Sequence, residues 1–278
     1  SLVSCFPFDG NFDDYRSGLK MLRQSGTFGL DRENNSNAAL ELNGVSDYLK
    51  YPARDLKGEN YVISLWVKPQ TNTGSTQCIF GIGTDPIRQN QLWFKDSGNG
   101  NYIFQFDYYG RSGRYDVARI PATPDTWVHL IIQKTPNDII IKDNFGHSNG
   151  TSVNSSDVPF IGNNAYLWIG SNATNSNFFK GSIDQFKYFS GGLPSNILDS
   201  LSLNKPCDLI LCNTRPVVTL PGFVRITPGT NTIYTEIKIN SKLNDKYRIQ
   251  SGDGIPGYHS NAYTNTFNFY VYKKENNL

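Results

Sequence analysis

Two stretches near the N-terminus, residues 39–52 and 61–69, constrain the fold of this chain most strongly. Apolar residues recur at every second position in them, as Leu40 and Leu42 show in the first stretch. Such alternation is typical of half-buried β-strands. Asn43-Gly44 divides the first stretch and is typical of a tight turn. The chain therefore opens with short strands joined by turns.

The same alternation of apolar runs and turn residues continues to about residue 204. This regular spacing predicts an all-β sandwich of two antiparallel sheets rather than an α/β fold. One helix is expected at 194–203, with Ser195 as its N-cap. The expected strands are 2–8, 26–30, 39–43, 47–52, 61–68, 77–82, 91–95, 101–109, 114–120, 126–134, 138–142, 165–170 and 179–189.

A linker is predicted after the helix, and five further short strands follow it. We therefore expect a first domain over residues 1–204 and a small β domain, Ig-like or an appended sheet, over 205–278. The net charge is +2, charged residues make up 18% of the chain, and no run of basic residues is present. Nucleic acid is therefore not an expected partner. No apolar run reaches the roughly 20 residues that a membrane span requires.

Four cysteines are too few for a disulfide scaffold. Cys207 and Cys212 are close enough in sequence to bridge. Cys5 and Cys78 pair only if the fold brings them together. The alternative for that second pair is two buried free thiols that pack as small apolar side chains.

Several motifs, in the order expected for one family, resemble the laminin-G-like modules of the concanavalin A-like family. Residues 2–14 resemble its opening strand and turn, and 39–69 resemble its next strands. Residues 125–132 are similar to its Trp-containing central strand, 167–170 to a late strand, and 181–188 to its closing signature. The resemblance implies a two-sheet jelly-roll sandwich, found in a secreted or cell-surface protein. In such a fold we expect Trp66, Trp127 and Trp168 to lie in the core.

Glycosidases share this fold, so an enzyme has to be considered. Hydrolysis needs two carboxylates about 5–9 Å apart. The chain has five glutamates, Glu33, Glu41, Glu59, Glu236 and Glu275, and none has a partner at the Glu-x-Asp-x-x-Glu spacing of the β-glucanases of this fold. We therefore predict that the chain is not an enzyme.

Many modules of the family hold a structural calcium ion, so the resemblance makes Ca²⁺ the expected cofactor. Calcium takes oxygen ligands from carboxylates and amides. Such groups crowd the first turn, and Asp184 near the closing strand is expected to meet them. The alternative is that the acidic residues only cap turns. The predicted ligands are Asp9, Asn11, Asp13, Asp14 and Asp184.

A sugar-binding surface combines aromatic rings with planar polar groups. The strand 101–109 has aromatic residues at 104, 106 and 108, and alternation requires one of its two side-chain sets to leave the core. The alternative is an ordinary aromatic strand followed by two solvated arginines. The predicted carbohydrate-binding residues are Trp93, Tyr108, Arg111, Arg114 and Tyr115.

The leading prediction is therefore a non-catalytic, lectin-like module of an extracellular or cell-surface protein, with a polysaccharide or glycan as its partner. The alternative is a protein–protein adhesion or spacer module, with other surface proteins as partners and no sugar site. A glycoside hydrolase of the same fold is the third possibility. Exposed aromatic residues would favour sugar, whereas a flat apolar patch would favour protein contact.

Overall fold

The computed structural model describes residues 1–17, 21–53, 56, 60–71, 76–83, 89–110, 115–153 and 165–202, with the side chains of Tyr115 and Asp116 excepted. The chain divides into two units, Ser1–Ile210 and Leu211–Leu278. The predicted β domain over 205–278 lies outside the described residues. Its fold and the predicted domain boundary therefore stay predictions.

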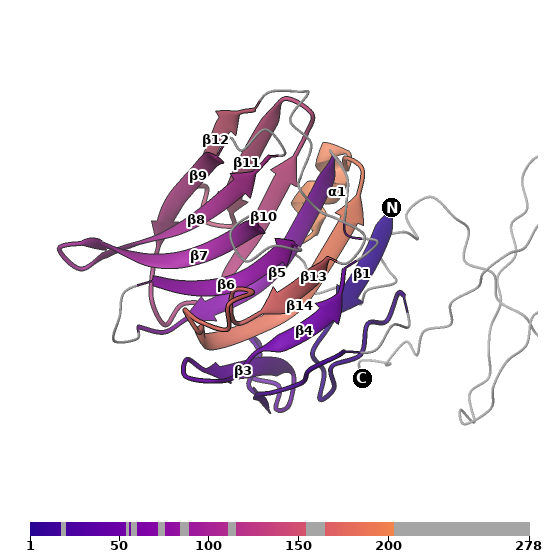
Figure 1. The fold of residues 1–278 in the computed structure, drawn as a ribbon, viewed down its shortest axis with the longest axis vertical. Coiled ribbons are helices and arrows are strands. Elements are labelled where there is room, and N and C mark those ends of the chain that lie inside the picture. The colour runs from indigo at the N-terminus through magenta and orange to yellow at the C-terminus, as the bar shows by residue number, and fades with distance from the viewer. Residues whose placement is uncertain are drawn as a thin grey trace, which may run out of the picture. The chain divides into compact units, whose positions relative to one another are not determined.

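Two sheets form the described part of the chain (Figure 1). The eight-stranded sheet has the order β12 (Ser148–Ser152), β11 (Asp138–Asp143), β10 (Val128–Lys134), β5 (Tyr61–Pro69), β14 (Lys180–Ser190), β3 (Ala39–Asn43) and β2 (Thr27–Gly29), and β1 (Leu2–Phe6) also pairs with β14. The six-stranded sheet has the order β4 (Leu49–Pro52), β13 (Tyr166–Ile169), β6 (Thr76–Gly83), β7 (Gln89–Gly98), β8 (Asn101–Tyr109) and β9 (Tyr115–Ala122). Every pairing between these strands is antiparallel.

The hydrophobic core lies between the two sheets. Leu65 and Val67 of β5 and Phe104 and Phe106 of β8 belong to this core and are fully buried. Alternate residues of each strand therefore face the opposite sheet, and the residues between them face outward. Burying one such side chain contributes about 1.5–3 kcal/mol. The predicted two-sheet antiparallel sandwich is confirmed.

None of the four tryptophans belongs to this core. Trp66 lies between the core residues Leu65 and Val67, and Trp168 lies between Leu167 and Ile169, so both point to the outer faces of their sheets. Trp168 is buried as predicted, with 5% of the residue exposed, although it lies on the outer face of its sheet. Trp66 and Trp127 are only half-buried, so the prediction that they are core residues is wrong. Alternation in the sequence assigns the residues of a strand to two faces. Only packing against the other sheet decides which of these faces lies inside.

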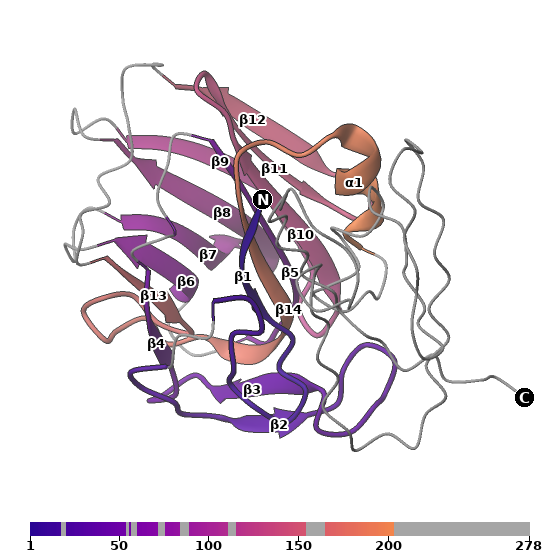
Figure 2. The ribbon, with the colours of Figure 1, turned by 90° about the vertical axis from the view of Figure 1, so that its right-hand side faces the viewer.

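The expected helix is present as α1 (Ser195–Ser200). Its N-cap is Pro194, without a side-chain capping bond, so the prediction of Ser195 as the cap is wrong. Lys142 of β11 lies 3.8 Å from Asp199, which places α1 beside the outer face of the eight-stranded sheet (Figure 2). No helix in the described part of the chain is long and apolar enough to cross a membrane.

The structure excludes one of the disulfides considered from the sequence, the bond between Cys5 and Cys78. Cys5 is part of a disulfide whose partner lies outside the described residues, whereas Cys78 is a buried free thiol. A bond between Cys5 and Cys78 is therefore excluded. Cys207 and Cys212 lie outside the described residues.

Candidate functional site

Polar side chains occupy the outer face of the six-stranded sheet where β7, β8 and β9 lie side by side. Leu92 and Phe94 of β7 point into the core, so Gln91 and Trp93 point outward. Direct cross-strand pairing sets Trp93 opposite Gln105 and Gln91 opposite Asp107 on β8. Gln105 in turn lies opposite Arg119 on β9. Four strand positions thus bring amide, carboxylate and guanidinium groups together.

Hydrogen bonds connect these groups into a row. Arg119 donates from Nε to Oε1 of Gln105 at 2.7 Å, and Gln105 donates from Nε2 to Oδ1 of Asp107 at 2.6 Å. Gln91 donates from Nε2 to Oε1 of Gln89 at 3.1 Å. Because each planar group is held by its neighbour, the row presents donors and acceptors in fixed positions.

Trp93 lies beside this row, opposite Gln105, and carries an unmatched donor. Only 9% of the residue is exposed, and its Nε1–H is buried without a hydrogen-bond partner. A buried donor without an acceptor costs about 1–3 kcal/mol. Lys95 lies over the ring, with its Nζ 5.3 Å from the centroid. The indole N–H is therefore the group of this face that most needs an acceptor.

A second aromatic group lies on the same face across β6. Trp168 of β13 meets Tyr166 edge to face at 5.6 Å between ring centroids, and Lys50 Nζ lies 4.0 Å from the Tyr166 ring. Gly81 of β6 lies opposite both Trp168 and Gln91. We call the following set the polar face: Gln89, Gln91, Trp93, Gln105, Asp107, Arg119 and Trp168.

Gly81 matters because it leaves room for Gln89. A Cβ atom at this position would lie 2.8 Å from Oε1 of Gln89. The main-chain N–H of Ala173 also donates to that oxygen, at 3.4 Å. The loop 171–177 therefore borders the polar face. Asn172 fixes this loop, since its Oδ1 accepts from the main-chain N–H groups of Thr174 and Ser176.

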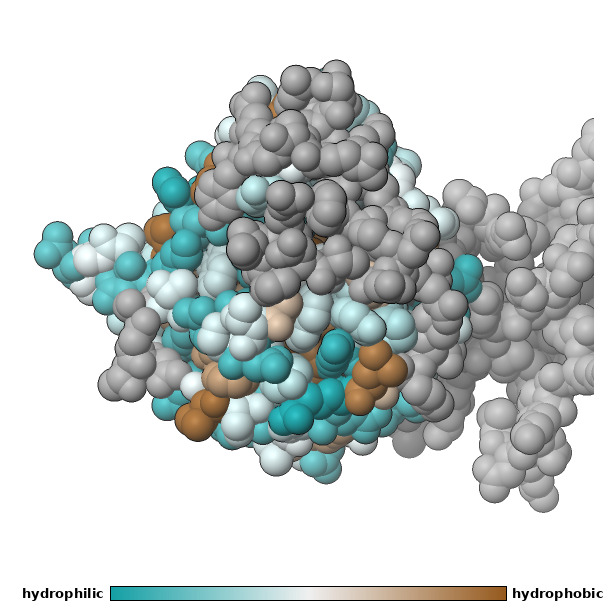
Figure 3. All heavy atoms as spheres, in the orientation of Figure 1, coloured by the Kyte–Doolittle hydropathy of each residue, from teal (hydrophilic) through white to brown (hydrophobic). Residues whose placement is uncertain are grey.

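Exposure differs across the polar face. Gln89, Gln105, Asp107 and Trp168 are buried, Gln91 is half-buried and Arg119 is exposed. The described surface in the view of Figure 3 is mainly hydrophilic, with only isolated hydrophobic residues. A flat apolar patch, which would favour protein docking, is not seen among the described residues of that view.

The predicted sugar-binding residues lie in different environments in the structure. Trp93 lies on the polar face, and its predicted role in carbohydrate binding stays a prediction. Tyr108 is 0% exposed and belongs to the hydrophobic core, so the prediction that it offers an accessible ring is wrong. Of the two side-chain sets of β8, the one containing Phe104, Phe106 and Tyr108 faces the other sheet. Arg111, Arg114 and the side chain of Tyr115 lie outside the described residues.

Six residues of the polar face were not predicted as site residues: Gln89, Gln91, Gln105, Asp107, Arg119 and Trp168. The signal for them was present in the sequence. Polar residues recur at every second position in β7 and β8, opposite an aromatic or aliphatic set. The alternation on strand 101–109 does not say whether its aromatic set or its polar set faces outward.

The predicted calcium ligands do not converge. Asp14 is buried and its carboxylate is fully used: Oδ1 accepts from the N–H groups of Cys5 and Arg16, and Oδ2 accepts from the hydroxyls of Ser17 and Tyr51. Oδ1 of Asn11 caps the main chain of Asp13 at 2.9 Å. No group of three or more His, Cys, Asp or Glu side chains suited to a metal ion occurs among the described residues.

Asp184, the fifth predicted ligand, contacts a cationic side chain instead. Arg32 donates from Nη1 to Oδ2 of Asp184 at 2.6 Å. The pKa of Asp184 is raised to about 7: burial is the main cause, the charges of Asp9 and Asp31 also raise it, and the Arg32 charge opposes them. Asp184 and Asp9 are thus close enough to interact, but Asp14 belongs to a separate network.

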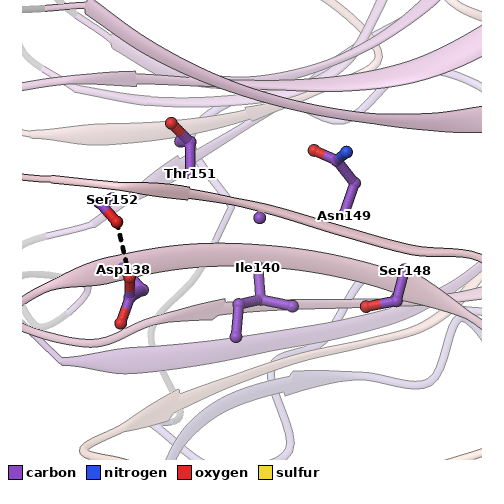
Figure 4. A pocket seen from close by; sticks show the side chains of 7 residues that line it. Asp138, Ile140, Ser148, Asn149, Thr151 and Ser152 are labelled. Carbon is purple, nitrogen blue, oxygen red and sulfur yellow. Dashed lines mark hydrogen bonds between the residues drawn. The ribbon is translucent and has the colours of Figure 1, made fainter.

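A shallow depression of about 360 Å³ lies over β11 and β12 (Figure 4). Its lining residues are Asp138, Ile140, Ser148, Asn149, Gly150, Thr151 and Ser152. Ser152 donates to Oδ1 of Asp138 at 3.3 Å. The lining has small hydroxyl and amide groups but no aromatic ring, whereas the polar face contains Trp93 and Trp168.

Comparison with protein families identifies the chain. Residues 43–196 match the family model of the concanavalin A-like lectin/glucanases superfamily (Laminin_G_3). The match covers more than half of the chain, and the chain belongs to this family. The resemblance predicted from the sequence motifs is thereby confirmed. No curated protein matches the sequence significantly.

Several solved structures share the fold. Domain 4 of AbnA, a GH43 extracellular arabinanase from Geobacillus stearothermophilus in complex with arabinotriose, is 24% identical with a TM-score of 0.51, over 72% of this chain and 98% of that domain. The binding domain of botulinum neurotoxin serotype G is 15% identical with a TM-score of 0.52, over 72% of this chain and 50% of the toxin domain. The binding domain of Paraclostridial Mosquitocidal Protein 1 is 17% identical with a TM-score of 0.51, over 72% and 51%. At these identities the likeness concerns the fold.

Proposed function

We propose that this chain is a non-catalytic carbohydrate-binding module and that the polar face is its binding surface. The observation that carries this proposal is the buried, unpaired indole N–H of Trp93 beside the row of planar groups. A sugar hydroxyl would supply the missing acceptor once a shift of the neighbouring side chains exposes this buried N–H. Planar amide and guanidinium groups suit carbohydrate because neighbouring hydroxyls offer donors and acceptors at close spacing.

The composition of the polar face supports binding without hydrolysis. Asp107 is its single carboxylate, and Gln105 donates a hydrogen bond to that group. Glycoside hydrolysis requires a pair of carboxylates on either side of the scissile bond. A set of seven side chains with one carboxylate, already held by an amide, is suited to recognition.

An extracellular location is part of the same proposal. Cys5 is in a disulfide, and disulfides persist mainly in oxidising compartments. Domain 4 of the arabinanase comes from an extracellular enzyme and was solved with arabinotriose. Arabinotriose is therefore a natural first probe in the panel, together with galactose-, glucose- and uronic-acid-containing oligosaccharides.

The test is a glycan array with the intact chain, in calcium and in chelator, followed by calorimetry on each hit. Trp93→Phe removes the N–H but keeps an aromatic ring. We expect it to weaken binding about tenfold, the equivalent of one hydrogen bond of about 1.4 kcal/mol. Arg119→Ala should weaken it to a similar degree. Trp127→Phe, at a half-buried tryptophan outside the polar face, is the matched control and should bind as the wild type does.

Two results would contradict the proposal. Wild-type affinity in both Trp93→Phe and Arg119→Ala would remove the polar face as the site. A folded chain that binds no glycan in the array would favour the adhesion alternative. Capture of a defined surface protein would then be the next measurement.

A further inference from the structure

Three acidic residues approach one another at the outer face of the eight-stranded sheet. Asp184 lies on β14, Asp31 follows β2, and Asp9 follows β1. Desolvation raises the pKa of Asp9, and the charge of Asp31 raises it further. The charges of both residues also raise the pKa of Asp184. Asp184 is buried and feels the charges of both other carboxylates, so its ionised form requires a compensating positive charge.

Arg32 provides that charge. Its Nη1 lies 2.6 Å from Oδ2 of Asp184, and the two side chains are only 9% and 3% exposed. The guanidinium carbon lies 4.6 Å from the centroid of the Trp66 ring, so the group is both paired and stacked. Glu33 lies 3.8 Å from Nη2 of the same guanidinium.

The surrounding loop holds Arg32 in this position. Oδ1 of Asp31 accepts from the main-chain N–H groups of Glu33 and Asn35, and Oδ2 accepts from the side-chain amide of Asn35. Desolvation raises the pKa of Asp31, but these hydrogen bonds and the Arg32 charge outweigh it, so the pKa of Asp31 is lowered. The loop between β2 and β3 therefore carries its arginine on a fixed turn.

A divalent cation does not fit beside this arginine. An ion bound to Asp184 would share its carboxylate with the guanidinium, and two like charges a few Å apart in a low-dielectric site repel strongly. The other predicted ligands are committed elsewhere, Asp14 to four donors and Asn11 to a turn. The guanidinium of Arg32 therefore occupies the place beside Asp184 that a cation would need.

We propose that Arg32 acts as a built-in cation, which makes the fold of this module independent of calcium. The arginine connects the loop between β2 and β3 to β14. Removal of the arginine should leave Asp9, Asp31 and Asp184 without a counter-charge. Carboxylate oxygens are hard ligands for Ca²⁺, so a calcium ion would then take the place of the guanidinium beside Asp184.

The test compares melting temperatures in millimolar calcium and in excess chelator. The wild type should melt at the same temperature in both. Arg32→Gln should melt several degrees lower in chelator and should recover part of that loss in calcium. Arg32→Lys keeps the charge and should show no calcium response. The double variant Arg32→Gln/Asp184→Asn removes the acceptor as well and should lose the response of the single variant.

The proposal is overturned if chelator lowers the melting temperature of the wild type, or if calorimetry detects a calcium site in it. It is also overturned if Arg32→Gln melts like the wild type in chelator. Should Arg32→Gln fail to fold in chelator, its refolding on addition of calcium supports the proposal, and failure to refold with calcium contradicts it. None of these readouts depends on glycan binding.

Discussion

Arg32 and Asp184 are 152 residues apart in the chain and 2.6 Å apart in the fold. Their ion pair connects the loop after β2 to β14, which lies between β5 and β3 in the eight-stranded sheet. Oδ1 of Asp184 and Nη2 of Arg32 have no hydrogen-bond partner. The contribution of the pair to the free energy of unfolding depends on whether Asp184 is ionised, because only the carboxylate attracts the guanidinium.

A double-mutant cycle on this pair should depend on pH. The pKa of Asp184 is raised to about 7, so the carboxylate becomes more ionised as the pH rises through that value. We expect a coupling energy between Arg32→Gln and Asp184→Asn of about 1–3 kcal/mol near pH 8, and a smaller one near pH 6. Urea unfolding of the four proteins measures it. A coupling energy that is equal at both pH values would contradict the raised pKa.

His129 should make the fold sensitive to acid. Its pKa is lowered to about 3, mainly by burial and in addition by the charges of Lys187, Arg32 and Lys142. The unfolded chain therefore binds more protons than the folded one between about pH 3 and 6.5, so this stabilisation is present above about pH 6.5 and lost as the pH falls. His129→Gln should reduce the loss of unfolding free energy between about pH 7 and pH 4.5.

The raised pKa of Asp184 acts in the opposite direction. Its contribution is present below the unfolded value of about 4 and is lost as the pH rises through about 7. The comparison of His129→Gln with the wild type at each pH separates the two groups. If both proteins lose the same free energy on acidification, the histidine is not responsible.

Tyr108 should be a stability residue and not a binding residue. It is fully buried in the core, with Lys134 Nζ 5.0 Å from its ring. Tyr108→Ala should lower the free energy of unfolding by about 3–5 kcal/mol, as expected for a large aromatic side chain removed from a core. Tyr109→Ala, at the half-buried neighbouring position, is the control and should cost much less. Denaturant unfolding of both variants checks this, and equal losses would contradict the assigned faces of β8.

Tyr51→Phe should test the network around Asp14. The Tyr51 hydroxyl donates to Oδ2 of Asp14 at 2.5 Å, and Asp14 is buried. Loss of this donor should cost about 1–3 kcal/mol, because a buried carboxylate oxygen loses one of its partners. Tyr15→Phe removes a hydroxyl from an exposed tyrosine and should change stability by less than about 0.5 kcal/mol. A loss of similar size in both variants would contradict a special role for Tyr51.

Gly81→Ala should weaken glycan binding without a large loss of stability. The new Cβ would meet the end of the flexible Gln89 side chain, so the amide moves while the backbone stays. We expect a loss of affinity of a few-fold and a change in melting temperature of only a few degrees. Gly192→Ala meets only ordinary contacts, at 3.6 Å from Asn60, and serves as the control. Unchanged affinity in Gly81→Ala would remove Gln89 from the site.

Most of the fold could be predicted from the sequence because its signals are local. Alternation in residues 39–52 and 61–69, turn residues between strands and the motifs of the family all lie within short segments. Helix α1 was also recognisable from its apolar spacing, although Pro194 rather than Ser195 begins it. Local backbone preferences and side-chain periodicity are therefore sufficient for the class of fold and for most of its strands, although β12 was not among the expected ones. The order of the strands within each sheet depends on long-range pairing.

The candidate site depends on choices that only the tertiary structure makes. Alternation divides β8 into one set with Phe104, Phe106 and Tyr108 and another with Gln105 and Asp107, but it does not say which set is inside. The opposite sheet decides this, because the larger gain in apolar burial comes from the aromatic set. The sequence was sufficient to predict Trp93 as a site residue near strand β8. Long-range packing determined which side chains form the polar face and placed Arg32 beside Asp184.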